Sequence, residues 1–220
     1  MMAGRGWAKD ALRSLLRGVG VEVYKARGGL FLCRVPHASR PDQRALRDAR
    51  RLNLGCGNVR LDGYANIDIV RTPATDIVAN IVSLPMIADN SIEVVRLEAV
   101  YEHLHRFERK AGLREWRRVL QPMGELSIAW IPDFEVYAEL FLNQRAGALS
   151  DPMTLDELYG YTHGNPMPGN APEQIHKDVF TKDSVRRELE DAGFEVVQMR
   201  NACHGDERVP LNINLLARKT

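Results

Sequence analysis

Cysteine is scarce in this chain. Its three cysteines, Cys33, Cys56 and Cys203, lie far apart along the 220 residues. An odd number of widely spaced thiols fits neither a disulfide framework nor a Cys-x-x-Cys zinc site, and no other group of residues has the sequence spacing of metal ligands. Scarce cysteine is typical of a reducing compartment, so we expect a cytoplasmic protein without a metal site.

Long apolar runs are also missing. No run approaches the roughly 20 residues that span a bilayer, and residues 1–7 lack the apolar stretch of a secretory signal. Hydrophobic residues make up 45% of the chain and charged residues 27%, which is ordinary for a globular protein and excludes a disordered one. The length allows one α/β domain with a small appendage.

Aromatic residues amount to only 7% of the chain, and the net charge of +1 is unevenly spread. Residues 1–60 carry 13 Lys and Arg against four acids. Such a basic segment could meet phosphate, anionic lipid or another subunit, although a solvated face is the simpler interpretation. Aromatic side chains are not interleaved with these bases, so we expect no nucleic-acid partner.

An N-terminal extension over residues 1–45 precedes the main domain at 46–220. Apolar spacing predicts an amphipathic helix over 7–17 and a β-hairpin at 19–25 and 30–35. The apolar face of this helix is narrow. We therefore expect it to pack on the domain or to form a homodimer rather than to lie on a membrane surface.

The main domain alternates short apolar runs with loops and amphipathic segments, which predicts a mostly parallel sheet covered by helices. The predicted strands are 51–54, 65–70, 76–80, 92–97 and 125–131. The predicted helices are 42–49, 107–120, 134–143 and 182–192. Two final strands, 194–199 and 212–217, have too short a connection for a crossover helix and should pair antiparallel.

Two segments of the main domain are predicted from composition. Glycine and proline crowd residues 160–172, which predicts irregular structure there. We expect 159–176 to form a lid or an acceptor-binding loop. The basic side chains of the predicted helix 107–120 are expected to form a solvated face; they are Arg109, Lys110, Arg114, Arg117 and Arg118.

A glycine turn and an aspartate follow the first two strands of the domain. Gly55 and Gly57 would let the backbone bend sharply and approach a ligand closely. Asp68 could accept hydrogen bonds from both ribose hydroxyls of a nucleoside cofactor. It comes 11 positions after Gly57, whereas a dinucleotide fold expects about 20 and a third glycine. A cofactor without phosphates is therefore favoured over NAD.

Seven segments in register resemble the short-loop, type 11-like branch of the class I S-adenosylmethionine-dependent methyltransferases. They are LGCG (54–57), GYANIDI (63–69), SLP (83–85), DNSIE (89–93), EHL (102–104), WRRVLQPMG (116–124) and IPD (131–133). The resemblance implies a Rossmann-like α/β fold with S-adenosyl-L-methionine as the cofactor. The C-terminal antiparallel hairpin is similar to that family's sheet.

The resemblance also implies which residues bind the cofactor. Ten are implied: Asn53, Gly55, Cys56 and Gly57 beside methionine and ribose, Asp68 on the ribose hydroxyls, Ile69, Asn80 and Ile81 around adenine, and Glu98 and Ala99 at the methyl-donor end. Asn80 stands where the family often has an acid, and Met123 replaces a usual glycine. Cys56 is interpreted as a small packing residue rather than a nucleophile.

Three residues, and less strongly a fourth, are candidates for catalysis. His103 follows the fourth strand, on the side where the methyl group should project, and could act as a base or orient the acceptor. His176, and less strongly His163, flank the breaker-rich segment. Asp133 lies at the carboxyl end of the fifth strand, where open α/β sheets bind ligands.

The expected function is O-methylation of a small-molecule or saccharide hydroxyl by in-line displacement. The saccharide preference comes only from the resemblance. An amine or carboxylate of a natural product or peptide is the alternative acceptor. A non-catalytic subunit that binds S-adenosylmethionine and docks through its N-terminal extension, and an NAD-linked oxidoreductase, are further alternatives.

Overall fold

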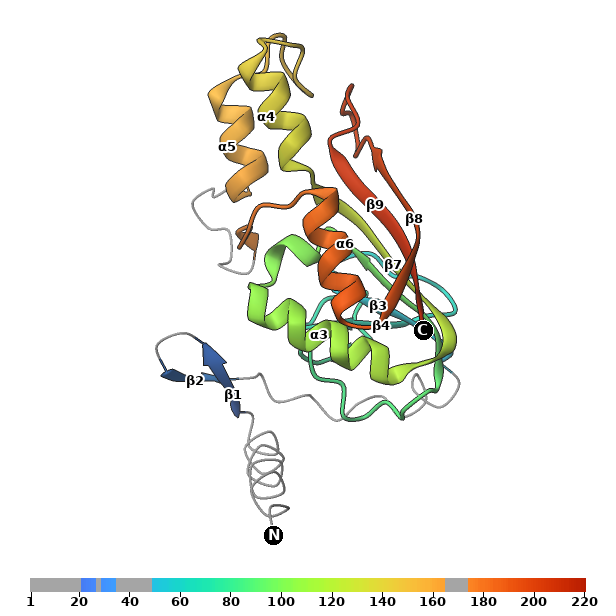
Figure 1. Cartoon of the computed structure of the whole chain (residues 1–220). Coiled ribbons are helices and arrows are strands. Elements are labelled where there is room, and N and C mark those ends of the chain that lie inside the picture. Colours follow the sequence, from blue (N-terminus) through green and yellow to red (C-terminus); the bar gives the residue numbers. More distant parts are fainter. Residues whose placement is uncertain (1–20, 27–28, 35–48, 165–173) are drawn as a thin grey trace.

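A computed structural model describes residues 21–26, 29–34, 49–164 and 174–220 (Figure 1). Strands β1 (Val21–Ala26) and β2 (Gly29–Arg34) pair antiparallel, with Ala26 opposite Gly29, so the predicted hairpin is confirmed. The predicted helix over 7–17 lies outside the described residues, as does nearly all of the one over 42–49. The boundary at residue 45 stays a prediction.

The main domain is built on a seven-stranded sheet in the order β5-β4-β3-β6-β7-β9-β8. Its strands are β3 (Arg51–Leu54), β4 (Ala65–Asp68), β5 (Ile77–Val78), β6 (Ile92–Glu98), β7 (Leu120–Pro132), β8 (Phe194–Ala202) and β9 (Asn212–Lys219). The pairs from β5 to β7 are parallel, and β9 runs antiparallel to both β7 and β8. The predicted mostly parallel sheet with an antiparallel C-terminal hairpin is confirmed.

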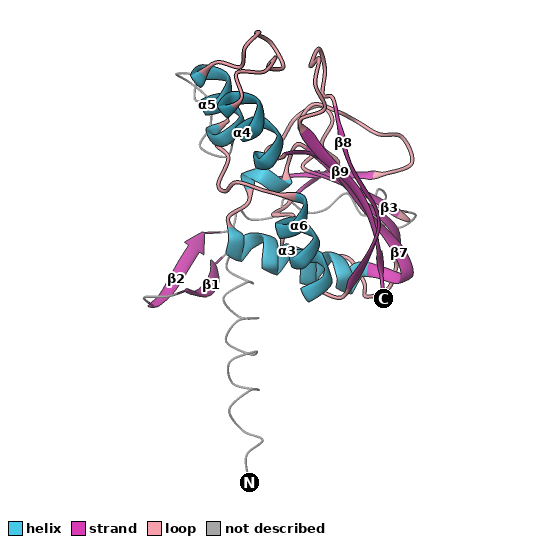
Figure 2. Ribbon diagram, turned by 45° about the horizontal axis from the view of Figure 1, so that its top comes forward, coloured by secondary structure: helices cyan, strands magenta, loops and turns pink. Residues whose placement is uncertain are grey.

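Helices α3 (Arg106–Val119) and α6 (Lys182–Asp191) lie side by side against one face of this sheet (Figures 1 and 2). No helix was predicted in the connections 55–64, 69–76 and 79–91, and they contain turns and no helix, so the alternation of strand and helix does not hold in this part of the sheet. Short parallel connections such as that from β3 to β4 leave no room for a crossover helix. Of the helices in the described ranges, none is long and apolar enough to cross a bilayer.

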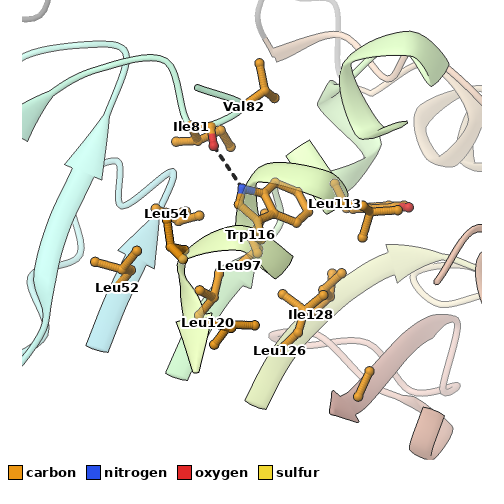
Figure 3. Close-up of a cluster of buried hydrophobic side chains, with 14 of the residues drawn as sticks. Leu52, Leu54, Ile81, Val82, Leu97, Leu113, Trp116, Leu120, Leu126 and Ile128 are labelled. Carbon is orange, nitrogen blue, oxygen red and sulfur yellow. Dashed lines mark hydrogen bonds between the residues drawn. The ribbon is translucent and has the colours of Figure 1, made fainter. Parts of the chain in front are cut away.

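Helix α3 anchors the core through its apolar face. Leu113 and Trp116 are buried, and the indole Nε1 of Trp116 donates a hydrogen bond to the Ile81 carbonyl at 2.8 Å (Figure 3). Apolar side chains of the parallel strands, including Leu54 and Leu97, pack in the same cluster (Figure 3). Through this hydrogen bond and the surrounding packing, the core fixes the position of the loop after β5.

We predicted that the basic residues of α3 form a solvated face, and this prediction is wrong for several of them. The Arg109 side chain is 1% exposed and bonds to Glu188 and Asp178. Arg117 donates to the carbonyls of Gly193 and Thr220, and Arg118 donates to those of Leu84 and Ile87. These guanidinium groups satisfy carboxylates and loop carbonyls that would otherwise lack partners. Lys110 and Arg114 are exposed, as expected.

A second, smaller unit lies beyond the end of the sheet. Helices α4 (Phe134–Leu142) and α5 (Leu155–His163) pack there around Tyr137 and Leu140 (Figure 1). Helix α5 was not predicted, because Gly160 was interpreted as a breaker. The Thr154 hydroxyl accepts from the Glu157 amide and the Glu157 carboxylate accepts from the Thr154 amide, so a capping box starts the helix.

Candidate active site

A glycine turn joins β3 to β4 at the carboxyl end of the parallel strands. The amides of Gly55 and Cys56 both donate to the Ile67 carbonyl, at 2.8 and 3.2 Å. Gly55 has a φ of +70°, and a Cβ there would lie 2.4 Å from Val100 Cγ2. Gly57 has a φ of +51° and open space where its Cβ would be. Only glycine fits at Gly55, and the space beside Gly57 is free for a ligand.

Asp68 lies against this turn. Its Oδ2 accepts the Gly57 amide at 2.8 Å, and its Oδ1 accepts the Val70 amide at 2.8 Å. An ionised carboxylate offers about four lone-pair sites, so each oxygen keeps one for a further donor. The Asp68 carboxylate is thus oriented by the protein and still able to accept two hydroxyls.

Asn53 supports the turn from below instead of facing a ligand. Its side chain is buried, and its amide donates to the Val59 carbonyl at 3.1 Å and to Asn66 Oδ1 at 3.0 Å. Asn66 in turn donates to Asp76, which also accepts a bond from Arg60 at 2.6 Å. This network was missed by the sequence analysis, because its members are close only after β3, β4 and β5 align.

Cys56 is a buried packing residue, as the sequence predicted. The thiol is buried 3.8 Å from the Thr75 hydroxyl, and burial raises the pKa of Cys56 above its usual value. A buried protonated thiol is a poor nucleophile. Cys56 therefore contributes packing and a backbone amide.

The adenine side of the predicted site is formed by Ile69, Asn80 and Ile81. Ile69 is 37% exposed beside Asp68, so an apolar surface is open to a base. The Asn80 side-chain oxygen accepts the Val82 amide at 3.1 Å and keeps a second lone pair, so it can accept a further hydrogen bond. The Ile81 carbonyl is held by Trp116. At the place where an acid could only accept, the Asn80 side chain can therefore accept or donate.

At the methyl-donor end, Ala99 follows β6 with a φ of +49°. Its neighbour Val100 contacts the Gly55 turn, as the close approach of their atoms shows. Ala99 also lines a cavity of about 590 Å³, whereas Glu98 pairs with Arg96 and lies outside the lining set. The glycine turn and this cavity are therefore adjoining parts of one site.

The cavity is lined by residues at the ends of β6 and β7, in α5, and in the connection from β8 to the start of β9. Its lining residues include Ala99, Glu102, His103, Trp130, Tyr161, His176, His204 and Glu207. Among the described residues that line it, four are acids, three are histidines and none is lysine or arginine. A cavity of this size and composition suits a small neutral or cationic molecule.

The structure brings His103 and His176 together although 72 residues separate them. Their rings meet edge to face at 5.1 Å in the cavity wall. Burial, followed by the nearby charge of His176, lowers the pKa of His103 to about 4, and burial also lowers the pKa of His176. Both imidazoles are neutral near pH 7 and offer nitrogen lone pairs to the cavity. His163 is exposed and stacks on Tyr159 instead.

The expectation that Asp133 binds the acceptor or acts as a base is corrected by its position. The side chain is completely buried and accepts bonds from Glu135 N at 3.3 Å and from Asn201 Nδ2 at 2.9 Å. It caps the N-terminus of α4 and is not among the cavity-lining residues. The carboxylate is used to join α4 to β8.

Trp130 was not predicted to belong to the site. It has a φ of +69° at a register shift in β7, and its amide donates to Asn214 Oδ1 at 2.9 Å. A bulky residue with positive φ is strained, and such residues cluster at functional sites. The irregularity aims the indole at the cavity, where its ring lies 5.0 Å from that of His204.

The loop expected over 159–176 is described only at its two ends. Gly160, Tyr161, Gly164, Gln174 and His176 all line the cavity. Residues 165–173 lie outside the described residues, so the lid remains a prediction. A larger concavity of about 930 Å³ between α3 and α6 is lined mostly by charged surface residues and is remote from the glycine turn.

The comparisons with known proteins agree with this geometry. Residues 52–128 match the family model described as a methyltransferase domain. This segment runs from β3 into β7 and contains the glycine turn, Asp68 and His103. In sequence, none of the functionally curated proteins matches the chain.

Solved structures share the fold at low sequence identity. An S-adenosylmethionine-dependent methyltransferase from Methanosarcina mazei is 18% identical with a TM-score of 0.51, over 82% of this chain and 97% of that chain. One from Mesorhizobium loti is 13% identical with a TM-score of 0.50, over 80% and 93%. The 1,6-didemethyltoxoflavin-N1-methyltransferase of Burkholderia thailandensis, solved with S-adenosylhomocysteine, is 15% identical with a TM-score of 0.52, over 100% and 92%.

Residues 52–128 therefore carry the match to a methyltransferase domain, and the fold around them is that of solved S-adenosylmethionine-dependent methyltransferases. Both findings make S-adenosylmethionine the cofactor with which the site is compared. The residues present fit that cofactor, because Asp68 retains two acceptor sites and the space beside Gly57 is open.

Proposed function

We propose that this methyltransferase transfers a methyl group to a hydroxyl of a small neutral acceptor, such as a polyol, saccharide or phenol, held in the cavity beside Ala99. The observation that carries the proposal is the pair of neutral imidazoles of His103 and His176 in the cavity wall. Their lone pairs can accept the hydrogen bond of an acceptor hydroxyl and so orient its oxygen.

When bound, S-adenosylmethionine supplies an already activated methyl group on a sulfonium. The chain's main task is therefore to align the acceptor and to exclude water. Trp130 and Tyr161 provide flat apolar surfaces that suit the face of a sugar or an aromatic ring. Asp68 and the glycine turn hold the nucleoside at the adjoining side of the site.

The charge of the cavity separates the possible acceptors. Besides the buried Glu102, three acids line the cavity, and among the described lining residues no lysine or arginine lies beside them. Their charge would repel a carboxylate, which disfavours carboxyl methylation. An amine or a ring nitrogen is compatible with this charge and is the second candidate. The Burkholderia thailandensis relative is by its name an N1-methyltransferase, so nitrogen acceptors belong in the same test.

The test is an acceptor screen read out as S-adenosylhomocysteine release, with neutral sugars and phenols, amines and carboxylates as three matched sets. We expect turnover with the hydroxyl set and a loss of kcat/KM of about a hundredfold for His176→Ala, because a misplaced acceptor reacts slowly. The exposed His163→Ala is the control and should retain its rate. Turnover of amines alone, with little effect of His103→Ala or His176→Ala, would favour N-methylation. Tight cofactor binding without turnover of any set would favour a non-catalytic subunit.

A further inference from the structure

Three potential metal ligands meet in the wall of the cavity. Ligand atoms of Glu102, His103 and His176 all lie within 4.8 Å of one another. The first two come from the 3-10 helix η1 (Tyr101–His103) after β6, and the third comes from the segment before α6. The sequence predicted no metal site, because two adjacent residues and a third about 70 positions away have no recognisable ligand spacing.

Both histidines are oriented as metal-binding histidines usually are. His103 Nδ1 lies 3.4 Å from the Ile175 carbonyl, and His176 Nδ1 lies 3.0 Å from the Tyr161 carbonyl. A carbonyl oxygen can only accept, so each imidazole carries its proton on Nδ1. Each Nε2 therefore has a free lone pair, and a backbone carbonyl fixes each ring as an outer partner does in metal sites.

Glu102 is a buried carboxyl group with one oxygen that has no hydrogen-bond partner among the described residues. The residue is 2% exposed, and its Oε2 makes no hydrogen bond within the described part of the chain. Its Oε1 lies 3.8 Å from His103 Nε2, beyond hydrogen-bonding distance. A buried carboxyl group without compensation is costly, and buried charges are normally paired or coordinate metals. Burial raises the pKa of Glu102 to about 8, which a nearby cation would reverse.

We propose that Glu102, His103 and His176 bind a divalent transition-metal cation, with its remaining coordination positions open to the acceptor cavity. Two imidazoles and one carboxylate suit Zn²⁺ or a similar first-row cation better than Mg²⁺ or Ca²⁺, which prefer oxygen ligands. Zinc ligands lie about 2.1 Å from the cation, so the three ligand atoms would converge by roughly an ångström on binding.

The cation would deepen the proposed function, and this second step rests on it. A hydroxyl at an open position would be held beside the methyl donor, and its pKa would fall. The acceptor oxygen would give its proton to water and form a bond to the methyl carbon, while the carbon–sulfur bond breaks with its electron pair on sulfur. A neutral hydroxyl could then react without a side chain that acts as a general base with a pKa near the working pH.

Metal binding is tested apart from turnover, on untagged, chelator-treated protein of full length. We expect isothermal titration with Zn²⁺ and with Co²⁺ to show one site, a change in the visible spectrum of Co²⁺, and no comparable site for Mg²⁺. Glu102→Gln and His176→Gln should each weaken Zn²⁺ binding at least about tenfold. His163→Gln removes an exposed imidazole nearby and should bind as the wild type does.

Glu102→Gln is nearly isosteric and removes a buried acid, so its melting temperature without metal should be no lower than that of the wild type. Zn²⁺ should raise the melting temperature of the wild type but not of this variant. No binding of Zn²⁺ or Co²⁺, or equal affinity in wild type and Glu102→Gln, would overturn the site.

Turnover separates the two proposals. If the site binds metal but no hydroxyl acceptor is methylated, the metal site stands and the proposed function fails. If hydroxyl methylation is found and proceeds unchanged after chelation, the proposed function stands and the role of the cation is overturned. If chelation abolishes hydroxyl methylation and added Zn²⁺ or Co²⁺ restores it, both the proposed function and the metal site are supported.

Discussion

Asp68 is the residue expected to join the glycine turn to the cofactor. Its two oxygens accept the amides of Gly57 and Val70, and each keeps a lone pair for a further donor. The carboxylate is already oriented before a ligand arrives, so little conformational entropy is lost when ribose binds. The affinity for the nucleoside should therefore depend strongly on this one side chain.

We predict that Asp68→Ala weakens binding of S-adenosylhomocysteine about a hundredfold or more. Hydrogen bonds to a charged group contribute roughly 1.5–3 kcal/mol each, and two ribose hydroxyls would lose their acceptor. Isothermal titration calorimetry measures the effect. Asp62→Ala, which removes an exposed acid from the same connection, is the control and should bind normally. Unchanged affinity in folded Asp68→Ala would remove the basis for the cofactor site described above.

Several residues other than glycine have a positive φ, a backbone conformation that their sequence pattern does not predict. Ala99 and Trp130 have φ values of +49° and +69°, and both line the cavity. Met123, where the resemblance expected glycine, has a φ of +62° in an exposed position. The position keeps the conformation that a glycine would favour although the residue has changed. Backbone strain of this kind becomes visible only in three dimensions.

At the scale of elements, α5 depends on Glu157. Its carboxylate accepts the amides of Leu149, Ser150 and Thr154, and it also contacts the Ser150 hydroxyl. Burial alone would raise the pKa of Glu157, but these hydrogen bonds outweigh burial and lower it to about 2. One side chain therefore fastens both the helix start and the loop before it.

The sign of the pH dependence follows from this lowered pKa. The stabilisation by Glu157 is complete above the ordinary glutamate pKa of 4.5. It should be lost as the pH falls from there towards 2. We predict that amide-exchange protection of Leu149 and Ser150 falls over this window, measured by NMR or mass spectrometry.

Glu157→Gln should show low protection at these amides at every pH. Glu139→Gln on α4 is the matched control, because Glu139 pairs with Arg145 in solvent and holds no loop amide. Equal protection in Glu157→Gln and wild type at neutral pH would contradict this account.

Arg109 shows how tertiary contacts changed the role of an element. The sequence placed it on a solvated helix face, yet it joins α3 to α6 through Glu188 and contacts Tyr101 and Phe180 through its guanidinium group. Buried ion pairs of this kind are weak evidence of stability, but they fix one arrangement of the packed elements. Here that arrangement positions η1, which carries His103.

At the scale of the whole molecule, a ligand stabilises only the fold that binds it. We predict that S-adenosylhomocysteine at about 100 times its Kd raises stability by roughly 2.7 kcal/mol. For a domain of this size that corresponds to a rise in melting temperature of about 5–10 °C. NAD at the same concentration should produce no shift. A shift with NAD and none with S-adenosylhomocysteine would favour the dinucleotide-binding alternative.

The sequence alone determined the class of fold and the positions of those proposed cofactor-binding residues that depend on local geometry. Gly55, Gly57 and Asp68 follow successive strands, and parallel strands bring their carboxyl ends to the same edge. Apolar periodicity likewise predicted α3, α6 and the closing hairpin. These features depend on neighbours in sequence, so a pattern within about 20 residues is enough to reveal them.

Only the tertiary structure decided which side chains share the acceptor cavity. His103 and His176 meet across 72 intervening residues, Trp130 enters through an irregularity in β7, and Asp133 turns inward to cap α4. The environment of Glu102 is set by burial that no local pattern encodes. Contacts between distant segments depend on how the packed elements fit together, so one-dimensional periodicity does not contain them.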